Sequence, residues 1–491
     1  MKTKNCLIPQ KAIIRIFGYF IAAITMVCFF LTSCNNKEDL LNPASNDAAT
    51  LTSKSLQCGK VFTVSPSGNY NDDSYNIQTA LDKAVTAGHG STVQLSNGTF
   101  YLKDGIVVEG FDGFFKGAGK DKTIITTNGA VSFNTPPDDM PALIKFRHGK
   151  IQISDFTIKI SDPGQVIPSA INITGNSTVD PISTGQAVNS TFDNVKFVGG
   201  TGNYTGDGIG YFNVFTFIYI WSEGWPPSPL NGGYKITNCE FQTAFQCISS
   251  EFTNKPCIIG GDKSSGNKFE DTYFPCLIFD VNNSHADISY NHFAKIYWTG
   301  VYIYQGQNVD PASLSLSKFL VYGNDIEVRP YDPANPGFTN AVFLADQGIW
   351  NGIGKKMDAN VSNNKIYLIN ISWGGILGSY TQDVRISNNK IWGNAMAGIY
   401  CGIWGDPSTD WLVKGNDVEG VNAQVAPIWL GSATSNFVVY SDKKDVLDEG
   451  TNNIVIGDHD KRSGHHYPLE NNKEMMRQHD MMKWHHHTDM K

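Results

Sequence analysis

The sequence predicts an all-β chain, wound as a single-stranded right-handed parallel β-helix with an N-terminal capping α-helix. Three observations support this fold class: a composition that favours turns over helices, a repeat of short strand-like segments, and one amphipathic segment ahead of the repeat. Of the 491 residues only 17% are charged, and 48 are glycine. This composition excludes a mostly helical protein.

The N-terminal segment is predicted to be a secretion signal. Residues 16–31 form an uncharged apolar run, preceded by basic residues and too short for a membrane span. The sequence that ends at Cys34 resembles the bacterial lipobox, and residues 37–39 (Lys-Glu-Asp) resemble an export signal of Bacteroidetes lipoproteins. The resemblance implies a signal peptide over 1–33, a lipid anchor on Cys34 in the outer membrane, and exposure at the cell surface; the alternative is periplasmic retention. Residues 34–58 are expected to be a flexible tether.

The segment before the repeat predicts the capping helix. Ile77, Leu81 and Ala84 fall at helical spacing, with Ser74 as the N-cap and Gly88 as the C-terminal stop. An amphipathic helix at this place covers the open end of a β-helix. Short strands with glycine turns follow it.

The repeat is the strongest signal in the chain. Each copy has an asparagine two residues before an apolar residue, and most copies carry a second short strand six to ten residues later. One such unit is one coil, and successive coils stack about 4.8 Å apart. Stacked asparagine side chains hydrogen-bond from coil to coil and tolerate a left-handed turn. The sequence therefore predicts a β-helix over 59–460, of about 11 or 12 coils, with a structural ladder of Asn267, Asn291, Asn324, Asn364, Asn389 and Asn416.

Three motifs near the N-terminus resemble the pectin-lyase-like superfamily. They are the helix Ile77–Ala84, the strand pair from Gly90 to Phe100, and the turn Gly117-Ala118-Gly119 with its following Asp121 and Thr123. The resemblance implies the β-helix fold, in a superfamily whose members cleave, isomerise or only bind polysaccharides. No catalytic motif of the superfamily can be carried over. Calcium is implied only if the protein is a lyase, and Arg329 is then the reserve candidate for the base.

A column of outward-facing residues is expected on the second strand of each coil, because strands alternate inward and outward positions. Aromatic side chains in such a column suit the apolar faces of sugar rings. The alternative is that loops cover the column and make it a second core. Its members are Leu277, Tyr302, Phe343, Leu377, Tyr400 and Trp429.

Candidate catalytic acids stand at the end of the same strands. Asp280, Gln305 and Asp346 fall on three successive coils, so the two acids are two coils apart, about 10 Å. A pair at that separation suits an inverting glycosidase, with Gln305 between them as a substrate contact. A structural role in turns is the alternative for both acids. Asp406, Asp410 and Glu251 are the reserve candidates for the acids.

The net charge of the chain restricts the classes of partner and substrate that we expect. The chain has 38 basic and 46 acidic residues, and four of the basic ones precede Cys34, so 34 − 46 leaves −12 after cleavage. Nucleic acid is therefore not expected as a partner. A polyuronate would be repelled, which favours hydrolysis of a neutral glycan over elimination. We expect a monomeric polysaccharide-acting protein that requires no cofactor; the alternatives are a non-catalytic glycan binder and a structural adhesin.

The C-terminal tail, residues 461–491, differs sharply in composition from the repeat. It is rich in histidine and methionine, which are soft ligands for copper and also suit nickel or zinc. The candidate ligands are His479, His485, His486 and His487. A disordered tail without a metal role is the alternative.

Overall fold

The computed structural model of the chain describes residues 59–133, 140–160, 162, 164–176, 189–201, 212–223, 232–251, 253, 255–279, 285–305, 318–333, 337–346, 356–371, 373–402 and 406–457. The predictions for the signal peptide, Cys34, the tether, Asp280 and the histidine-rich tail lie outside these residues. Within them, no helix has the length and apolar character needed to cross a membrane.

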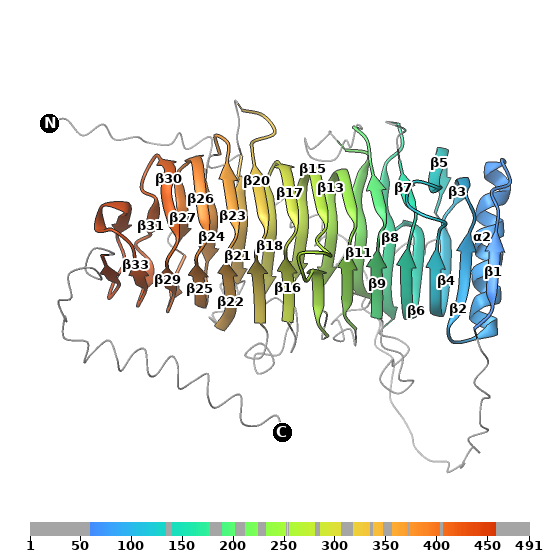
Figure 1. Cartoon of the computed structure of the whole chain (residues 1–491), viewed down its shortest axis with the longest axis horizontal. Helices are drawn as coiled ribbons and strands as arrows, with labels where there is room; N and C mark the ends of the chain where they lie inside the picture. Colours follow the sequence, from blue (N-terminus) through green and yellow to red (C-terminus); the bar gives the residue numbers. More distant parts are fainter. Residues whose placement is uncertain are drawn as a thin grey trace, which may run out of the picture.

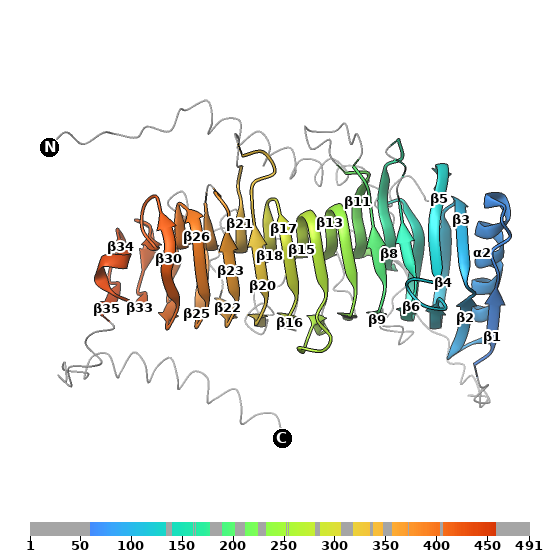
Figure 2. The same ribbon diagram turned by 45° about the horizontal axis from the view of Figure 1, so that its top comes forward.

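The molecule is an elongated parallel β-helix, as the sequence predicts (Figures 1 and 2). The described residues form one continuous sheet of 35 strands. All its strand pairs are parallel, and each coil pairs with the coils before and after it, for example β16 with β14 and β19. The right-handed sense of the winding stays a prediction.

The sheet is folded into three long faces, here called A, B and C. Face A consists of β1 (Val61–Val64), β2 (Ser91–Leu95), the second halves of β4 (Ile106–Lys116) and β6 (Ala142–Ser154), β9 (Asn189–Asp193), β12 (Tyr234–Thr237), β14 (Cys257–Gly260), β16 (His285–Ser289), β19 (Lys318–Tyr322), β22 (Lys356–Ser362), β25 (Gln382–Ser387), β29 (Leu412–Lys414), β33 (Val438–Tyr440) and β35 (Ile454–Ile456). Two short strands, β28 (Ser408–Thr409) and β32 (Thr434–Ser435), extend it.

Face B follows face A in each coil. It consists of β3 (Gly98–Asp104), β5 (Thr123–Ser132), β7 (Thr157–Lys159), β10 (Lys196–Val198), the first halves of β13 (Glu240–Glu251) and β15 (Lys268–Phe279), β17 (His292–Ile296), β20 (Asp325–Val328), β23 (Lys365–Leu368), β26 (Lys390–Ala395) and β30 (Asp417–Ala423).

Face C completes the coil. It consists of the first halves of β4 and β6, β8 (Ile167–Asn176), β11 (Val214–Glu223), the second halves of β13 and β15, β18 (Thr299–Gln305), β21 (Asn340–Asp346), β24 (Gly374–Ser379), β27 (Ala397–Cys401), β31 (Ile428–Leu430) and β34 (Val446–Asp448). A short 3-10 helix, η2 (Lys443–Asp445), leads into β34.

The capping helix is α2, Tyr70–Ala87, and it lies across the first coils at one end of the molecule (Figure 1). Its apolar side, which includes Ile77 and Leu81, is fully buried. Gly88 has a φ of +91° and ends the helix as predicted. The predicted N-cap is wrong: Ser74 lies inside α2, where its hydroxyl accepts hydrogen bonds from the backbone N–H groups of Lys103 and Asp104.

The predicted asparagine ladder is confirmed. Asn324, which is 1% exposed, accepts hydrogen bonds from the backbone and side-chain amides of Asn291 at 2.9 and 3.1 Å. It donates to the side chain of Asn364 at 3.0 Å and to the carbonyl of Ile288 at 2.8 Å. The same pattern links the ladder from Asn267 to Asn416.

The left-handed backbone of each turn is not on the ladder residue itself. In the turns from Asn291 to Asn416 it falls on the residue before the ladder asparagine, as at Tyr290, Asn363 and Asn388, with φ values of 58°, 57° and 55°. This corrects the expectation that the ladder asparagines adopt that conformation. Their contribution is therefore hydrogen bonding between coils, while the preceding residue makes the turn.

The core runs along the axis between the three faces. On face B, aligned inward phenylalanines stack in register, with ring centroids 5.0 Å apart for Phe197–Phe241, 4.9 Å for Phe241–Phe269 and 4.7 Å for Phe269–Phe293. Stacking of identical rings follows from the spacing of the coils. The outward columns of face C keep one register along the core, whereas register shifts occur on face A between β22 and β25 and on face B at three strand pairs.

Candidate functional site

The predicted column on face C exists in the predicted register. Leu277 pairs with Tyr302, Tyr302 with Phe343, Phe343 with Leu377, Leu377 with Tyr400, and Tyr400 with Trp429. Toward the N-terminus the same register continues through Ser249, Tyr219, Asn172, Lys145 and Val107. Counting Leu447, which pairs with Trp429, the column has one residue on each of twelve coils in the described part of the chain.

The column changes chemistry along its length. Its N-terminal half is polar, and Tyr219 donates a hydrogen bond of 3.2 Å to Glu251, an acid of the neighbouring outward column. Lys145 in this half is fully buried. The C-terminal half is aromatic and aliphatic. The rings of the column that stack from coil to coil therefore lie in its C-terminal half.

The middle of the aromatic half is covered, so the alternative of a second core applies there. Phe343, Leu377 and Tyr400 are 3%, 0% and 5% exposed. Phe338 packs edge-on against Phe343 with ring centroids 5.2 Å apart, and Trp373 stacks with Tyr400 at 6.4 Å. The predicted glycan contacts of Phe343 and Tyr400 thus lack an exposed ring in this structure.

The margins of the aromatic half remain open. Tyr302, Tyr304, Trp373 and Trp429 are half-buried around the covered centre. Tyr302 stacks on Phe343 at 5.0 Å, and burial raises the pKa of its hydroxyl. Trp429 stacks on Tyr400 at 4.1 Å with an angle of 3° between the rings. These buried partners hold the marginal rings in fixed orientations, which favours stacking with a ligand.

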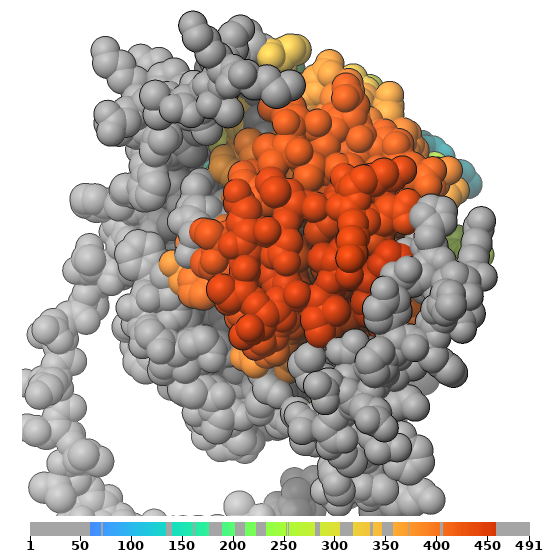
Figure 3. All heavy atoms as spheres, turned by 90° about the vertical axis from the view of Figure 1, so that its left-hand side faces the viewer, coloured from blue at the N-terminus to red at the C-terminus, as the bar shows by residue number. Residues whose placement is uncertain are grey.

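The Trp429 indole N–H donates a hydrogen bond of 3.0 Å to Glu449. This bond fixes the outer edge of the last ring in the column. Figure 3 shows the C-terminal end of the molecule, where the last coils form a solid surface. The aromatic half of face C ends there.

Two of the three predicted acid-column positions lie within the described strands. Gln305 pairs with Asp346 across adjacent coils, as their spacing predicts. The side chains of both residues, and Asp280 altogether, fall outside the described part of the structure. The proposed pairing of Asp280 with Asp346 stays a prediction.

Asp406 is an acid that the structure places at the aromatic half of face C. It accepts a hydrogen bond of 2.5 Å from the Ser379 hydroxyl, which holds it at the end of β24, two residues beyond Leu377. Burial raises the pKa of Asp406, against the hydrogen bonds from Ser379 and Tyr380, which lower it. A raised pKa makes a carboxyl better suited to donate a proton.

The local backbone supports this placement. Tyr380 has a φ of +55°, an uncommon conformation for a bulky residue, and it turns the chain away at the end of β24. Ala345 pairs with Ser379, so the backbone of Asp346 lies one coil from the segment that binds Asp406. The sequence alone ranked Asp406 only as a reserve candidate for a catalytic acid, because the contact with Ser379 joins residues 27 positions apart.

Arg329 does not join this site. It forms an ion pair with Glu327 through Nη2 and a second contact of 3.0 Å through Nε. Glu327 lies on β20 of face B, and Arg329 is the residue directly after that strand. As a reserve base for a lyase, Arg329 is therefore separated from the acids of face C.

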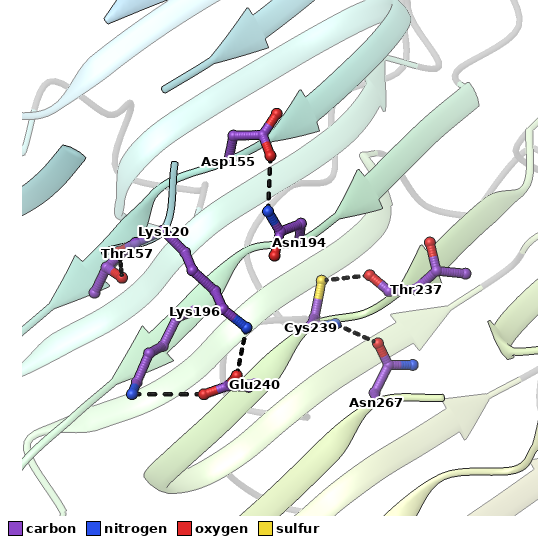
Figure 4. Close-up of polar contacts among 9 residues, drawn as sticks. All are labelled: Lys120, Asp155, Thr157, Asn194, Lys196, Thr237, Cys239, Glu240 and Asn267. Atoms are coloured by element: carbon purple, nitrogen blue, oxygen red, sulfur yellow. Dashed lines mark hydrogen bonds and ion pairs between the residues drawn. The ribbon is translucent and has the colours of Figure 1, made fainter. Parts of the chain in front are cut away.

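A polar groove of about 470 Å³ lies at the corner between faces A and B (Figure 4). Lys120 and Lys196 both pair with Glu240, at 2.5 and 3.5 Å, and the Lys120 hydrogen bond lowers the pKa of Glu240. On the next turn, Asn194 donates to Asp155 at 2.8 Å. Because these groups form ion pairs and hydrogen bonds with one another, the groove is better explained as a polar network that stabilises the turns. No group of three or more potential metal ligands occurs among the described residues.

Comparison with known proteins finds similarity to solved structures but not to any family model or curated sequence. No protein-family model and no curated protein matches the chain. A double mutant of the tailspike protein of E. coli bacteriophage HK620 is similar in structure, with 11% identity and a TM-score of 0.47, over 82% of this chain and 77% of the tailspike chain.

Two further solved structures show a comparable likeness. The A-module of the Azotobacter vinelandii mannuronan C-5 epimerase AlgE6 has 11% identity and a TM-score of 0.32, covering 78% of this chain and 94% of its own. PfbA, a surface adhesin of Streptococcus pneumoniae, has 14% identity and a TM-score of 0.37, covering 77% and 89%. At such identities the similarity concerns the fold alone.

Proposed function

We propose that this protein is a cell-surface lipoprotein that binds a neutral polysaccharide along the aromatic half of face C and hydrolyses it. The observation that carries the proposal is the set of fixed, half-buried rings at Tyr302, Tyr304, Trp373 and Trp429, together with an Asp406 carboxyl that Ser379 of β24 holds on the same face. Rings in fixed orientations bind the apolar faces of sugars, and burial, which raises the pKa of the Asp406 carboxyl, favours its use as a proton donor to a glycosidic oxygen.

The reaction needs a second carboxylate, and Asp346 is the candidate. Asp406 donates its proton to the glycosidic oxygen as the carbon–oxygen bond breaks. Asp346 takes a proton from a water molecule, whose oxygen forms the new bond to the anomeric carbon. A neutral substrate fits best because none of the described column positions from Leu277 to Trp429 is basic, so a uronate would meet no cation there.

The anchor belongs to the same proposal. Acylation of Cys34 with the tether of residues 34–58 would hold the β-helix at the outer membrane, facing external polysaccharide. Palmitate labelling should be lost in Cys34→Ser. Protease added to intact cells should degrade the chain; a chain that survives shaving but not cell lysis would place it in the periplasm.

The catalytic test measures release of reducing ends from a panel of neutral and uronic polysaccharides. We expect Asp406→Asn to lower turnover by 10²-fold or more, the usual effect of losing a general acid, and Asp346→Asn to do the same. Asp410→Asn is the matched control, since Asp410 accepts a hydrogen bond of 3.0 Å from Gln382 on face A. Full turnover in both Asp406→Asn and Asp346→Asn would remove the hydrolase assignment.

The second candidate is glycan binding without cleavage. One contact favours it: the short hydrogen bond from Ser379 gives Asp406 a structural partner. In that case the wild-type chain is retarded by a polysaccharide in native gels but releases no reducing ends. Trp429→Ala would then weaken retention, while Asp406→Asn would leave it unchanged.

A further inference from the structure

The outward side of face B carries its own exposed aromatic pair near the C-terminus. Tyr367 on β23 and Trp392 on β26 occupy the same register position, with ring centroids 5.6 Å apart and 29° between the rings. Tyr367 is 39% exposed and Trp392 is half-buried. This pair belongs neither to the core nor to the column on face C.

The position after Trp392 in this register has no side chain. Gly420 of β30 pairs with Trp392, and a Cβ at Gly420 would lie 2.7 Å from the Trp392 Cβ. A larger residue is therefore excluded, and the row of aromatic side chains has a gap after Trp392, next to the register shift between β26 and β30. Glycine in the interior of a strand weakens that strand, so its presence at this position needs an explanation.

A second ladder of asparagines lies next to the rings. Asn394 follows Trp392 by two residues on β26, and it donates a hydrogen bond of 2.9 Å to Asn370. Asn422 donates one of 3.0 Å to Asn394. All three side chains are exposed. Amide groups thus repeat at the coil spacing of about 4.8 Å, beside a pair of stacked rings.

The exposed ladder differs from the buried one in how many hydrogen bonds it uses. A buried asparagine such as Asn364 donates both side-chain hydrogens and accepts two bonds. Within the described chain, the Asn394 side chain donates one hydrogen bond and accepts one. Because a primary amide can donate two and accept two, each exposed rung keeps a donor and an acceptor for a ligand.

The rungs line a groove of about 270 Å³ that contains no ionisable side chain. Ile371 and Ala395, which are 2% and 1% exposed, give it an apolar floor. Lys390, the nearest cation on the same strand, pairs with Asp417 at 3.8 Å and lies 5.9 Å from the centre of the Trp392 ring. An anionic ligand would find no cation inside the groove. Rings, amides and an apolar floor together match a neutral carbohydrate.

We propose that the outward side of β23, β26 and β30 is a second carbohydrate-binding surface, which takes a neutral polysaccharide on the Tyr367–Trp392 rings and the Asn370–Asn394–Asn422 amides. It lies on another face of the β-helix from the proposed catalytic margin. It does not depend on any cleavage at face C. Two surfaces on one chain raise the avidity for a polymer that can reach both.

The experiment uses native gel electrophoresis in gels that contain dextran, mannan, galactan or mixed-linkage β-glucan. The background is the chain carrying Tyr302→Ala and Trp429→Ala, which removes two of the four half-buried rings of face C. In a gel that retards this background, Trp392→Ala should weaken the affinity about tenfold, the equivalent of one lost ring–sugar contact. Asn394→Ala should weaken it by a smaller factor, and added salt should have little effect.

Tyr75→Ala is the control, because Tyr75 is the most exposed aromatic of the described chain at 71% and lies on the capping helix. Far-UV circular dichroism checks that each variant keeps the β-helix, and Tyr367→Ala repeats the test at the other ring. Unchanged retention in both Trp392→Ala and Tyr367→Ala would overturn the proposal, as would a background chain that no neutral polysaccharide retards. Reducing-end release by Trp392→Ala, measured separately on an oligosaccharide too short to reach both surfaces, reports on face C alone.

Discussion

The buried asparagine ladder makes a quantitative prediction for Asn324→Ala. The substitution removes two donated and two accepted side-chain hydrogen bonds at a site that is 1% exposed. At about 1 kcal/mol net for each, the loss is about 4 kcal/mol, and the Asn291 backbone N–H is left in the core without its acceptor. Alanine cannot replace any of these contacts, and water has no access.

Asn416→Ala is the matched variant at the end of the same ladder. Asn416 is half-buried, accepts two bonds from Asn389 and donates one to Ile386, so it loses three bonds where water can replace part of them. We expect a loss of about 1–2 kcal/mol. Urea unfolding followed by circular dichroism, with equal m values, gives both numbers. A loss below about 1 kcal/mol for Asn324→Ala, or an equal loss for both variants, would refute the assignment of stability to the ladder.

Three further predictions concern stability and reactivity. Because burial raises the pKa of Asp406, the folded chain binds the carboxyl proton more tightly than the unfolded chain does. The free energy of unfolding should therefore fall as pH rises from about 3.9 through the raised pKa. Asp406→Asn should abolish this fall, measured as the urea midpoint at each pH. Gly378→Ala should cost about 1–3 kcal/mol, since its Cβ would lie 2.3 Å from the buried Trp411 ring, whereas Gly164→Ala should be neutral in the same thermal melts. Burial raises the pKa of Cys239 and Cys257 to about 12, so iodoacetamide at pH 8 should modify neither thiol until urea is added, as peptide mass mapping would show.

The periodic features of this fold could be predicted from the sequence because the coil imposes one repeat on everything it positions. Asn291, Asn324 and Asn364 recur two residues before an apolar residue, and each forms the expected ladder contact. The register of Tyr302 and Phe343 followed from the same count of residues. The capping helix was visible as a change of period, although its first residue was not, since Ser74 binds β3 instead of capping.

Contacts made by turns of unequal length could not be predicted in this way. Phe338 and Trp373 precede their strands in segments that do not repeat, yet they cover the centre of the column on face C. The link between Ser379 and Asp406 is of the same kind. The exposed ladder did leave a signal, because Asn370, Asn394 and Asn422 follow buried ladder asparagines by six, five and six residues.

The stacking of coils explains why both proposed surfaces are aromatic and lie near the same end. A parallel β-helix places equivalent side chains about 4.8 Å apart, a distance at which rings stack on one another whether they face the core or the solvent. On face C, neighbouring rings cover Tyr400 and Phe343. Only the rings at the margins of the column therefore keep surface for a ligand. On face B the glycine at position 420 stops the stack after two rings, so no third ring covers Trp392 from that strand. The exposed surface for a ligand is therefore set by where each stack is interrupted.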